Sequence, residues 1–178
     1  MIDMNEFEKV NSEIQQLARH IVKTCSERGF RLATAESCTG GLVSAAVTEV
    51  SGSSAVIELG VCSYSNRIKQ QVLGVSEKTL AQHTEYSIQC AEEMAKGVMA
   101  LSGADIAVST TGVAGPTGGT EAHPVGEVCI AVRSRERVHS KRYVFESKSG
   151  DGFDERDFIR AQATRKALML LELIIMTE

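Results

Sequence analysis

Short apolar runs alternate with segments of helical periodicity along this chain, and this alternation constrains the fold more than any other feature. Apolar residues recur at steps of three and four from Phe7 to Cys25, and Gly29 follows as a stop signal. This pattern predicts an amphipathic first helix. Residues 30–35 (FRLATA) are then predicted to form a strand, and a helix beginning near Thr39 is predicted to follow it.

The alternation continues through the middle of the chain. Two strands and two helices are predicted there: strands 59–65 and 104–112, and helices 66–74 and 88–102. Asn66 and Ser87 are the expected N-caps of these helices, because short polar side chains accept hydrogen bonds from the unpaired amides of a first turn. Gly74 is the expected end of the shorter helix.

The last third of the chain predicts a hairpin and a long terminal helix. A short charged turn joins two strand patterns, residues 127–134 and 137–147, which favours antiparallel pairing. Residues 154–176 are predicted to form the last helix, with Asp154 near its start. Alternating elements with one late hairpin therefore predict an α/β protein of one domain. Its expected fold is a three-layer α/β/α sandwich around a mixed, mostly parallel sheet.

Charge, cysteine content and hydropathy exclude several classes of function. The net charge is −4 at pH 7, so no basic surplus is present to neutralise the phosphates of a nucleic acid. The five cysteines are widely spaced and include no C-x-x-C pair, which indicates reduced thiols rather than a disulfide framework or a zinc site. No apolar run approaches the roughly 18 residues of a membrane span, and the acidic residues 1–10 lack the apolar core of a secretion signal, so export is not expected. We therefore expect a cytoplasmic protein without nucleic-acid or membrane partners.

The segment TAESCTGG, residues 34–41, lies where a predicted strand meets a helix. In one interpretation a hydroxyl simply caps the unpaired amides of the helix. Gly40 and Gly41, however, each cost a helix roughly 1 kcal/mol relative to alanine, which favours a ligand that approaches the backbone. Ser37 would then be a nucleophile beside amides of residues 38–41 that bind an oxyanion. Cys38 is the alternative nucleophile, because a helix N-terminus can lower a thiol pKa.

Two further segments are expected at the same end of the sheet. Tyr64 ends a strand, and Lys69 lies in the first turn of the next helix, where it can act as a base if burial lowers its pKa. An ordinary exposed helix lysine is the alternative. Residues 112–126 (GVAGPTGGTEAHPVG) hold five of the fifteen glycines and both prolines of the chain. Such a loop is suited to surround an anionic ligand with backbone amides, although a tight structural crossover is the alternative.

In this order and spacing, AESCTGG, YSNRIK and TGVAGPTGGTEAHPVG resemble the CinA C-terminal family, also called the PncC or nicotinamide-nucleotide amidase family. The likeness extends from about Leu32 to Leu171. Larger members of the family carry an additional N-terminal domain. The resemblance therefore implies a stand-alone amidase domain for residues 1–178.

The resemblance implies hydrolysis of the carboxamide of nicotinamide mononucleotide to nicotinate mononucleotide and ammonia, with no metal or cofactor. Ser37 matches the family nucleophile, Lys69 its base, and Tyr64 a tyrosine near the substrate and base. Thr111 matches a Ser/Thr position, and Arg156 matches the arginine of a Gly-Asp-Arg motif. With the two glycine segments, the candidate substrate-binding residues are Thr39, Gly40, Gly41, Thr111, Gly112, Gly115, Gly118, Gly119, His123 and Arg156.

Two departures from the family pattern fall where the substrate phosphate is expected to bind. The family loop usually carries lysine before Pro-Val-Gly, where this chain has His123. The segment SKSGDGFDERD around Arg156 is longer than the usual connection. These departures support a second hypothesis, a diverged paralogue that is weakly active or inactive and binds a nucleotide-like ligand.

The terminal helix is apolar on more than one face from Leu168 onward. One face is expected to pack on the sheet, which leaves apolar surface for a symmetric interface. The family resemblance also implies a dimer. We therefore expect a homodimer.

Overall fold

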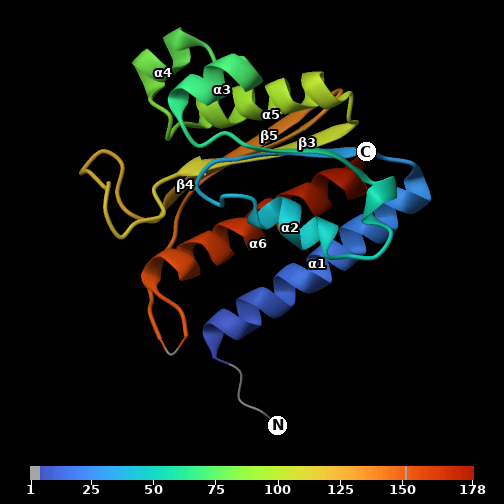
Figure 1. Ribbon diagram of the computed structural model, residues 1–178, viewed down its shortest axis with the longest axis horizontal. Helices are drawn as coiled ribbons and strands as arrows, with labels where there is room; N and C mark the ends of the chain where they lie inside the picture. The colour runs from blue at the N-terminus through green and yellow to red at the C-terminus, as the bar shows by residue number, and fades with distance from the viewer. Residues whose placement is uncertain (1–4, 151) are drawn as a thin grey trace.

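The computed structural model describes residues 5–150 and 152–178 as one five-stranded sheet with helices on both faces (Figure 1). The elements are α1 (Glu6–Arg28), β1 (Leu32–Glu36), α2 (Leu42–Thr48), the 3-10 helix η1 (Ser53–Ala55), β2 (Ile57–Cys62), α3 (Asn66–Leu73), α4 (Glu77–His83), α5 (Ile88–Ser102), β3 (Ile106–Gly112), β4 (Glu127–Ser134), β5 (Val138–Val144) and α6 (Glu155–Thr177). Helices α3, α4 and α5 cover one face of the sheet, and α1, α2 and α6 cover the other. The predicted three-layer α/β/α fold is confirmed.

The sheet has the strand order β2-β1-β3-β4-β5 and is mixed, as predicted. Strand β1 pairs in parallel with β2 and with β3, whereas β4 pairs antiparallel with β3 and with β5. Four strands therefore run in one direction and β4 runs in the other. The carboxyl ends of β1, β2 and β3 meet at one edge of the sheet, which is where ligands commonly bind in open α/β sheets.

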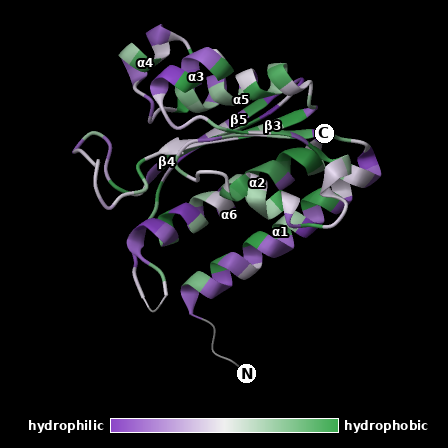
Figure 2. Cartoon of the chain, viewed as in Figure 1, coloured by the Kyte–Doolittle hydropathy of each residue, from purple (hydrophilic) through white to green (hydrophobic). Residues whose placement is uncertain are grey.

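Helices α1 and α6 pack against each other and bury a continuous apolar layer on one face of the sheet. The buried side chains of α6 include Phe158, Leu168 and Leu171. Figure 2 shows that α6 changes from hydrophilic near its start to hydrophobic toward its end. Its hydrophilic start therefore lies at the edge of the sheet where the strand ends meet, and its apolar end is suited to the core.

The local signals at several helix ends are confirmed. Helix α5 extends from Ile88 to Ser102 with Ser87 as its N-cap, and α1 ends at Gly29, which has the left-handed conformation that glycine adopts without strain. Asp154 caps α6 and forms a reciprocal capping box with Asp157.

Other boundaries differ from the prediction. Helix α2 begins at Leu42 rather than near Thr39, because residues 37–41 form turns that end in two left-handed glycines. Strand β2 covers Ile57–Cys62 rather than residues 59–65, and the N-cap of α3 is Ser65 rather than Asn66. Helix α4 and η1 were not predicted, because seven and three residues are too few to display a helical period.

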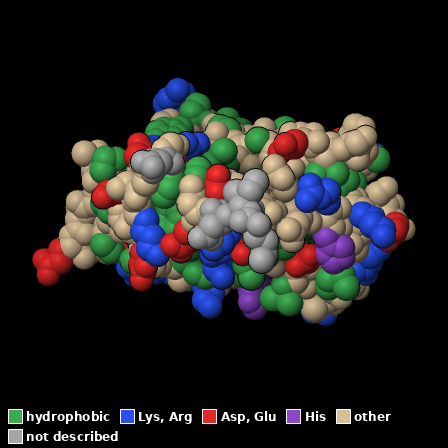
Figure 3. Space-filling model, turned by 90° about the horizontal axis from the view of Figure 1, so that it is seen from below, with side chains coloured by type: hydrophobic (Ala, Val, Ile, Leu, Met, Phe, Trp, Pro, Cys, Tyr) green, Lys and Arg blue, Asp and Glu red, His purple; other side chains and the backbone are tan. Residues whose placement is uncertain are grey.

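The surface carries charges of both signs. On the face shown in Figure 3, acidic, basic and apolar side chains are interspersed and form no large patch of one sign. Within the described residues, no helix combines the length and the apolar character that crossing a bilayer requires.

Candidate active site

A cleft of about 170 Å³ opens where β1, β2 and β3 end. Its walls come from the turn after β1, the start of α3, the segment before α5, the loop after β3 and the first turn of α6. The predicted site residues that line it are Ser37, Tyr64, Lys69, Gly112, Gly115, Gly118 and Arg156. Thr39, Gly40, Gly41, Thr111, Gly119 and His123 are not among the lining residues.

Ser37 and Lys69 form a buried pair in the cleft. Lys69 Nζ lies 3.0 Å from Ser37 Oγ, and it also donates to the carbonyl oxygen of Ser63 at 3.0 Å. The two side chains are 8% and 1% exposed, respectively. Burial lowers the pKa of Lys69 from its ordinary value, because it removes water from the ammonium group. The alternative of an exposed helix lysine is therefore wrong, and the geometry is that of a nucleophile beside a base.

The start of α3 explains how Lys69 reaches Ser37. The amide of Ser63 donates to the carbonyl of Glu36, which ties the end of β2 to the end of β1. Ser65 then caps α3, and Lys69 is the fourth residue of that helix. Because helical side chains tilt toward the N-terminus, Lys69 extends back over the strand ends toward Ser37.

The turn that carries Ser37 is held by the carboxylate of Glu36, which is 1% exposed. This carboxylate accepts hydrogen bonds from the amides of Gly41, Val43 and Ser44 at 2.9, 3.0 and 2.8 Å. It also accepts from the hydroxyls of Thr39 and Ser44 at 2.6 and 2.7 Å. The interpretation of a hydroxyl cap is therefore wrong, because a carboxylate from the preceding strand binds the first-turn amides of α2.

This arrangement narrows the expected oxyanion site. The amide of Gly41 is bonded to Glu36, and the amide of Gly40 donates to the carbonyl of Ser37. Within residues 5–150 and 152–178, the amides of Cys38 and Thr39 donate to no oxygen acceptor. Of the amides predicted between residues 38 and 41, these two are the candidates to stabilise an oxyanion.

Thr39, Gly40 and Gly41 shape the turn and do not face the cleft. The Thr39 hydroxyl lies 2.7 Å from the hydroxyl of Thr110, and the Thr39 carbonyl accepts a hydrogen bond from Arg160 at 2.8 Å. Gly40 and Gly41 have φ values of +62° and +100°. Residues that have a side chain rarely adopt this backbone conformation. The turn itself therefore explains why both positions are glycine, and no ligand is needed to explain them.

Cys38 lines the cleft beside Ser37 and is 5% exposed. Burial raises the pKa of its thiol to about 12, which is opposite to the lowering expected for a reactive cysteine at a helix N-terminus. A protonated thiol is a poor nucleophile. The geometry therefore favours serine as the attacking residue.

Arg156 spans the mouth of the cleft. One of its nitrogens donates to the carbonyl of Gly115 at 2.7 Å, and another donates to the hydroxyl of Tyr64 at 3.0 Å. Both acceptors are neutral, so the guanidinium charge remains available to an anionic group of a ligand. This contact also joins the loop after β3 to the segment before α3.

The glycines of the loop after β3 permit close contacts. A Cβ atom on Gly112 would lie 2.2 Å from the carbonyl oxygen of Glu127, and one on Gly115 would lie 2.4 Å from Val125. A Cβ atom on Gly119 would lie 2.8 Å from Val125, but Gly119 lies outside the cleft lining. The loop is therefore folded on itself, and only part of it faces the cleft.

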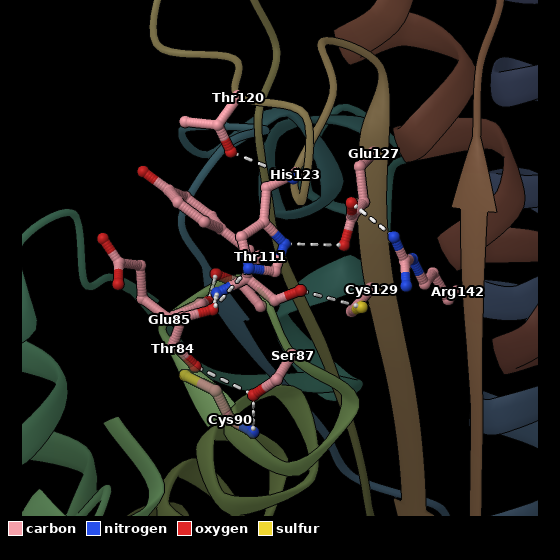
Figure 4. Close-up of polar contacts among 11 residues, drawn as sticks. Thr84, Glu85, Ser87, Cys90, Thr111, Thr120, His123, Glu127, Cys129 and Arg142 are labelled. Carbon is pink, nitrogen blue, oxygen red and sulfur yellow. Dashed lines mark hydrogen bonds and ion pairs between the residues drawn. The ribbon is translucent and has the colours of Figure 1, made fainter. Parts of the chain in front are cut away.

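Thr111 and His123 are not among the residues that line the cleft, and Figure 4 shows their polar contacts. The Thr111 hydroxyl donates to the carbonyl of Glu85 at 2.6 Å. The His123 ring contacts the Thr84 hydroxyl and the buried Glu127 carboxylate, each at 3.2 Å. Neither side chain lines the cleft, so the geometry gives no support to direct substrate binding by these two residues.

Sequence reasoning missed several residues that build the site. Glu85 and Tyr86 line the cleft from a segment that carries no recognisable motif, and Asn66 lines it from the first position of α3. Glu36 stands next to Ser37, and Arg160 follows Arg156 by one helical turn. Glu36 and Arg160 could have been predicted from these spacings, because residues adjacent in a motif or one turn apart on a helix often belong to the same site.

Comparison with known proteins places the chain in a family. The family described as CinA C-terminal domain matches residues 14–175. The nicotinamide-nucleotide amidohydrolase PncC of Escherichia coli strain K12 is 44% identical over 162 residues, which cover 90% of this chain and 94% of that protein. A CinA-like protein of Chloroherpeton thalassium is 49% identical over 127 residues, which cover 71% of this chain.

The lengths of the relatives differ. This chain spans 30% of the Chloroherpeton protein and 34% of a putative competence-damage inducible protein of Caldanaerobacter subterraneus. Among solved structures, the competence/damage inducible protein CihA from Agrobacterium tumefaciens superposes with a TM-score of 0.84 at 40% identity. The match covers 93% of this chain and 96% of that chain.

Proposed function

The chain belongs to the CinA C-terminal domain family, and from that premise we propose that it hydrolyses nicotinamide mononucleotide to nicotinate mononucleotide and ammonia. The observation that carries the proposal is the buried Ser37–Lys69 pair in the cleft, with 3.0 Å between Oγ and Nζ. A relative of matching length that is named a nicotinamide-nucleotide amidohydrolase supports the choice of substrate. Residues 1–178 would act as one amidase domain.

In the proposed mechanism, neutral Lys69 takes the proton of Ser37 as Oγ attacks the carboxamide carbon. The amides of Cys38 and Thr39 stabilise the resulting oxyanion. The tetrahedral intermediate collapses when Lys69 returns a proton to the nitrogen, so the C–N bond breaks and ammonia leaves. Water, deprotonated by Lys69, then attacks the ester on Ser37, and nicotinate mononucleotide is released. Lys69 regains its neutral state after it reprotonates Ser37 Oγ.

Substrate binding is assigned to the mouth of the cleft. Arg156 offers a guanidinium group with a fixed fork of donors, which suits a phosphate. Tyr64 contacts Arg156, and its side chain is 65% exposed, so a bound nucleotide can reach it. Gly112, Gly115 and Gly118 also line the cleft and have no side chains that would block it.

The test is ammonia release from nicotinamide mononucleotide by the purified protein. Ser37→Ala is expected to abolish turnover and to preserve binding, because the hydroxyl acts mainly in the covalent step. Lys69→Ala is expected to abolish turnover as well, and the double variant is expected to lose little more. A native protein that releases no ammonia between pH 6 and pH 10 would contradict the proposal.

A second candidate is a diverged paralogue that binds a nucleotide-like ligand without efficient hydrolysis. The position of His123 favours it, because this residue contacts Glu127 and leaves the described cleft lining without a cation from the loop. Calorimetry would then show binding of the nucleotide at concentrations where no ammonia is released. Efficient release of ammonia would exclude this candidate.

We also propose that the chain forms a homodimer through α6. Met169, Leu173 and Met176 are 42%, 50% and 59% exposed and recur at steps of four and three residues on this helix. Such a stripe on a surface helix is suited to a symmetric interface. Light scattering of the native protein is expected to give a dimer mass, and Leu173→Glu a monomer mass. A native monomer at micromolar concentration would contradict the proposal.

A further inference from the structure

The segment Thr84–Ser87, which connects α4 to α5, is fixed by hydrogen bonds to its main chain (Figure 4). The Thr111 hydroxyl on β3 donates to the carbonyl of Glu85 at 2.6 Å. The Cys129 thiol on β4 donates to the carbonyl of Tyr86 at 3.2 Å. Two neighbouring strands therefore hold two successive carbonyl groups of this short segment in place.

The start of the segment has an unusual backbone conformation. Thr84 has a φ of +66°, and in the described parts of the chain it is the one residue other than glycine with a positive φ. Its hydroxyl contacts His123 and accepts a hydrogen bond from the amide of Tyr86 at 3.3 Å. Its carbonyl accepts from the Ser87 hydroxyl at 2.8 Å. Strained backbone that its surroundings hold this firmly is typical of functional sites.

The consequence of this arrangement is the position of Glu85. Glu85 is one of the residues that line the cleft with Ser37 and Lys69. In Figure 4 the Glu85 carboxylate projects away from the cluster of His123 and Glu127. Of the residues that line the cleft in the described structure, Glu85 is the one carboxylate, and no ion pair in that part of the chain includes it.

A carboxylate at this position opposes the chemistry of the base. Burial lowers the pKa of Lys69, whereas the negative charge of Glu85 raises it. A higher pKa makes neutral Lys69 less abundant at neutral pH, and neutral Lys69 is the form that accepts the proton of Ser37. Glu85 is therefore poorly explained as a helper of the base, and a role toward the substrate accounts for it better.

The charges of the cleft match those of the proposed substrate. The nicotinamide ring of a nucleotide is a pyridinium cation, because its nitrogen is bonded to ribose, and the phosphate is an anion. Arg156 and Glu85 both line the cleft, so it presents one positive and one negative side chain besides Lys69. We propose that Glu85 is the counter-ion of the pyridinium ring and that it selects the N-ribosylated, cationic amide over neutral amides. This inference rests on the proposed function.

The test compares two ligands that differ in ring charge. Nicotinamide mononucleotide has a cationic ring, and its reduced 1,4-dihydro form has a neutral ring with the same carboxamide, ribose and phosphate. Binding of both is measured by calorimetry on Ser37→Ala, which prevents turnover. Adding Glu85→Gln is expected to weaken the binding of the oxidised form roughly five- to tenfold, as for the loss of a partly exposed charge pair. Binding of the reduced form is expected to stay within about twofold.

Two matched variants control this experiment. Glu121→Gln removes an exposed carboxylate from the neighbouring glycine loop and should leave the ratio of the two affinities unchanged. Glu85→Asp keeps the charge and should retain a preference for the oxidised form. If Glu85→Gln weakened the binding of both forms equally, or weakened the binding of neither, the proposal that Glu85 is the counter-ion would be wrong. If neither form binds and the native protein releases no ammonia, the proposed function itself is wrong.

Discussion

The most direct test of how the nucleophile turn is built is Glu36→Gln. The carboxylate of Glu36 accepts five hydrogen bonds and is 1% exposed. Glutamine has the same shape but offers one oxygen and one NH₂ group. Its oxygen can replace the carboxylate oxygen that serves Thr39, Gly41 and Val43, which leaves the NH₂ group facing Ser44. The Ser44 hydroxyl can rotate to accept a hydrogen bond, but its amide cannot.

The magnitude follows from these contacts. One buried amide without an acceptor costs about 1–3 kcal/mol, and each of three hydrogen bonds that changes from a charged to a neutral acceptor weakens by roughly 1 kcal/mol. Because such effects are not additive, we expect Glu36→Gln to lower the free energy of unfolding by about 3–5 kcal/mol. This is a large part of the roughly 5–15 kcal/mol that stabilises a typical domain. We also expect kcat to fall, since Ser37 follows Glu36 directly.

Urea unfolding at neutral pH, followed by circular dichroism, measures this change. Glu49→Gln is the matched control, because Glu49 is an exposed glutamate at the other end of α2, and it should shift stability by no more than about 0.5 kcal/mol. A loss below about 1 kcal/mol for Glu36→Gln would refute the reasoning. It would mean that water or a rearranged turn replaces the carboxylate at little cost.

Three further changes test separate parts of the site. Arg156→Ala is expected to raise KM for nicotinamide mononucleotide about tenfold or more with a smaller effect on kcat, as for loss of a phosphate contact; an unchanged KM in steady-state assays would contradict this role. Cys38→Ala is expected to remain active. The native enzyme should keep its activity in iodoacetamide at pH 8, because burial raises the pKa of the Cys38 thiol to about 12. The rate should rise with pH as Lys69 loses its proton, at a pH below the ordinary lysine value of 10.5, because burial lowers its pKa. Glu85→Gln should move this limb of the kcat profile to still lower pH, because the Glu85 charge raises the Lys69 pKa; an unchanged limb would show that the charge does not act on Lys69.

The parts of the fold that were predicted correctly are those with local causes. Helix α5 and its Ser87 cap were predicted to the residue, because the apolar period, the capping hydroxyl and the terminal glycine lie within one segment. The start of α2 was not predicted correctly, because its cap is Glu36. This residue lies on the preceding strand and accepts hydrogen bonds from amides up to eight residues away. The cap of α3 was misplaced by one residue, since serine and asparagine both suit that position.

The site was predictable only in part for a related reason. Ser37 and Lys69 are separated by 32 positions and meet because β1 and β2 are neighbours in the sheet, which no local pattern states. Resemblance to a family supplied that pairing. Glu85 has no motif around it and no helical or strand period, so only the folded arrangement of Thr111 and Cys129 shows that its segment is held at the cleft.

Thr111 and His123 lie outside the cleft lining, although both were predicted to bind substrate. Both contact the segment that carries Glu85: Thr111 donates to the Glu85 carbonyl, and His123 contacts the adjacent Thr84 hydroxyl. His123 in turn bonds Glu127, whose carboxylate is also paired with Arg142 at 2.7 Å. His123 thus connects the loop after β3 to the start of the segment 84–87, and a change at this position is expected to alter the placement of that segment.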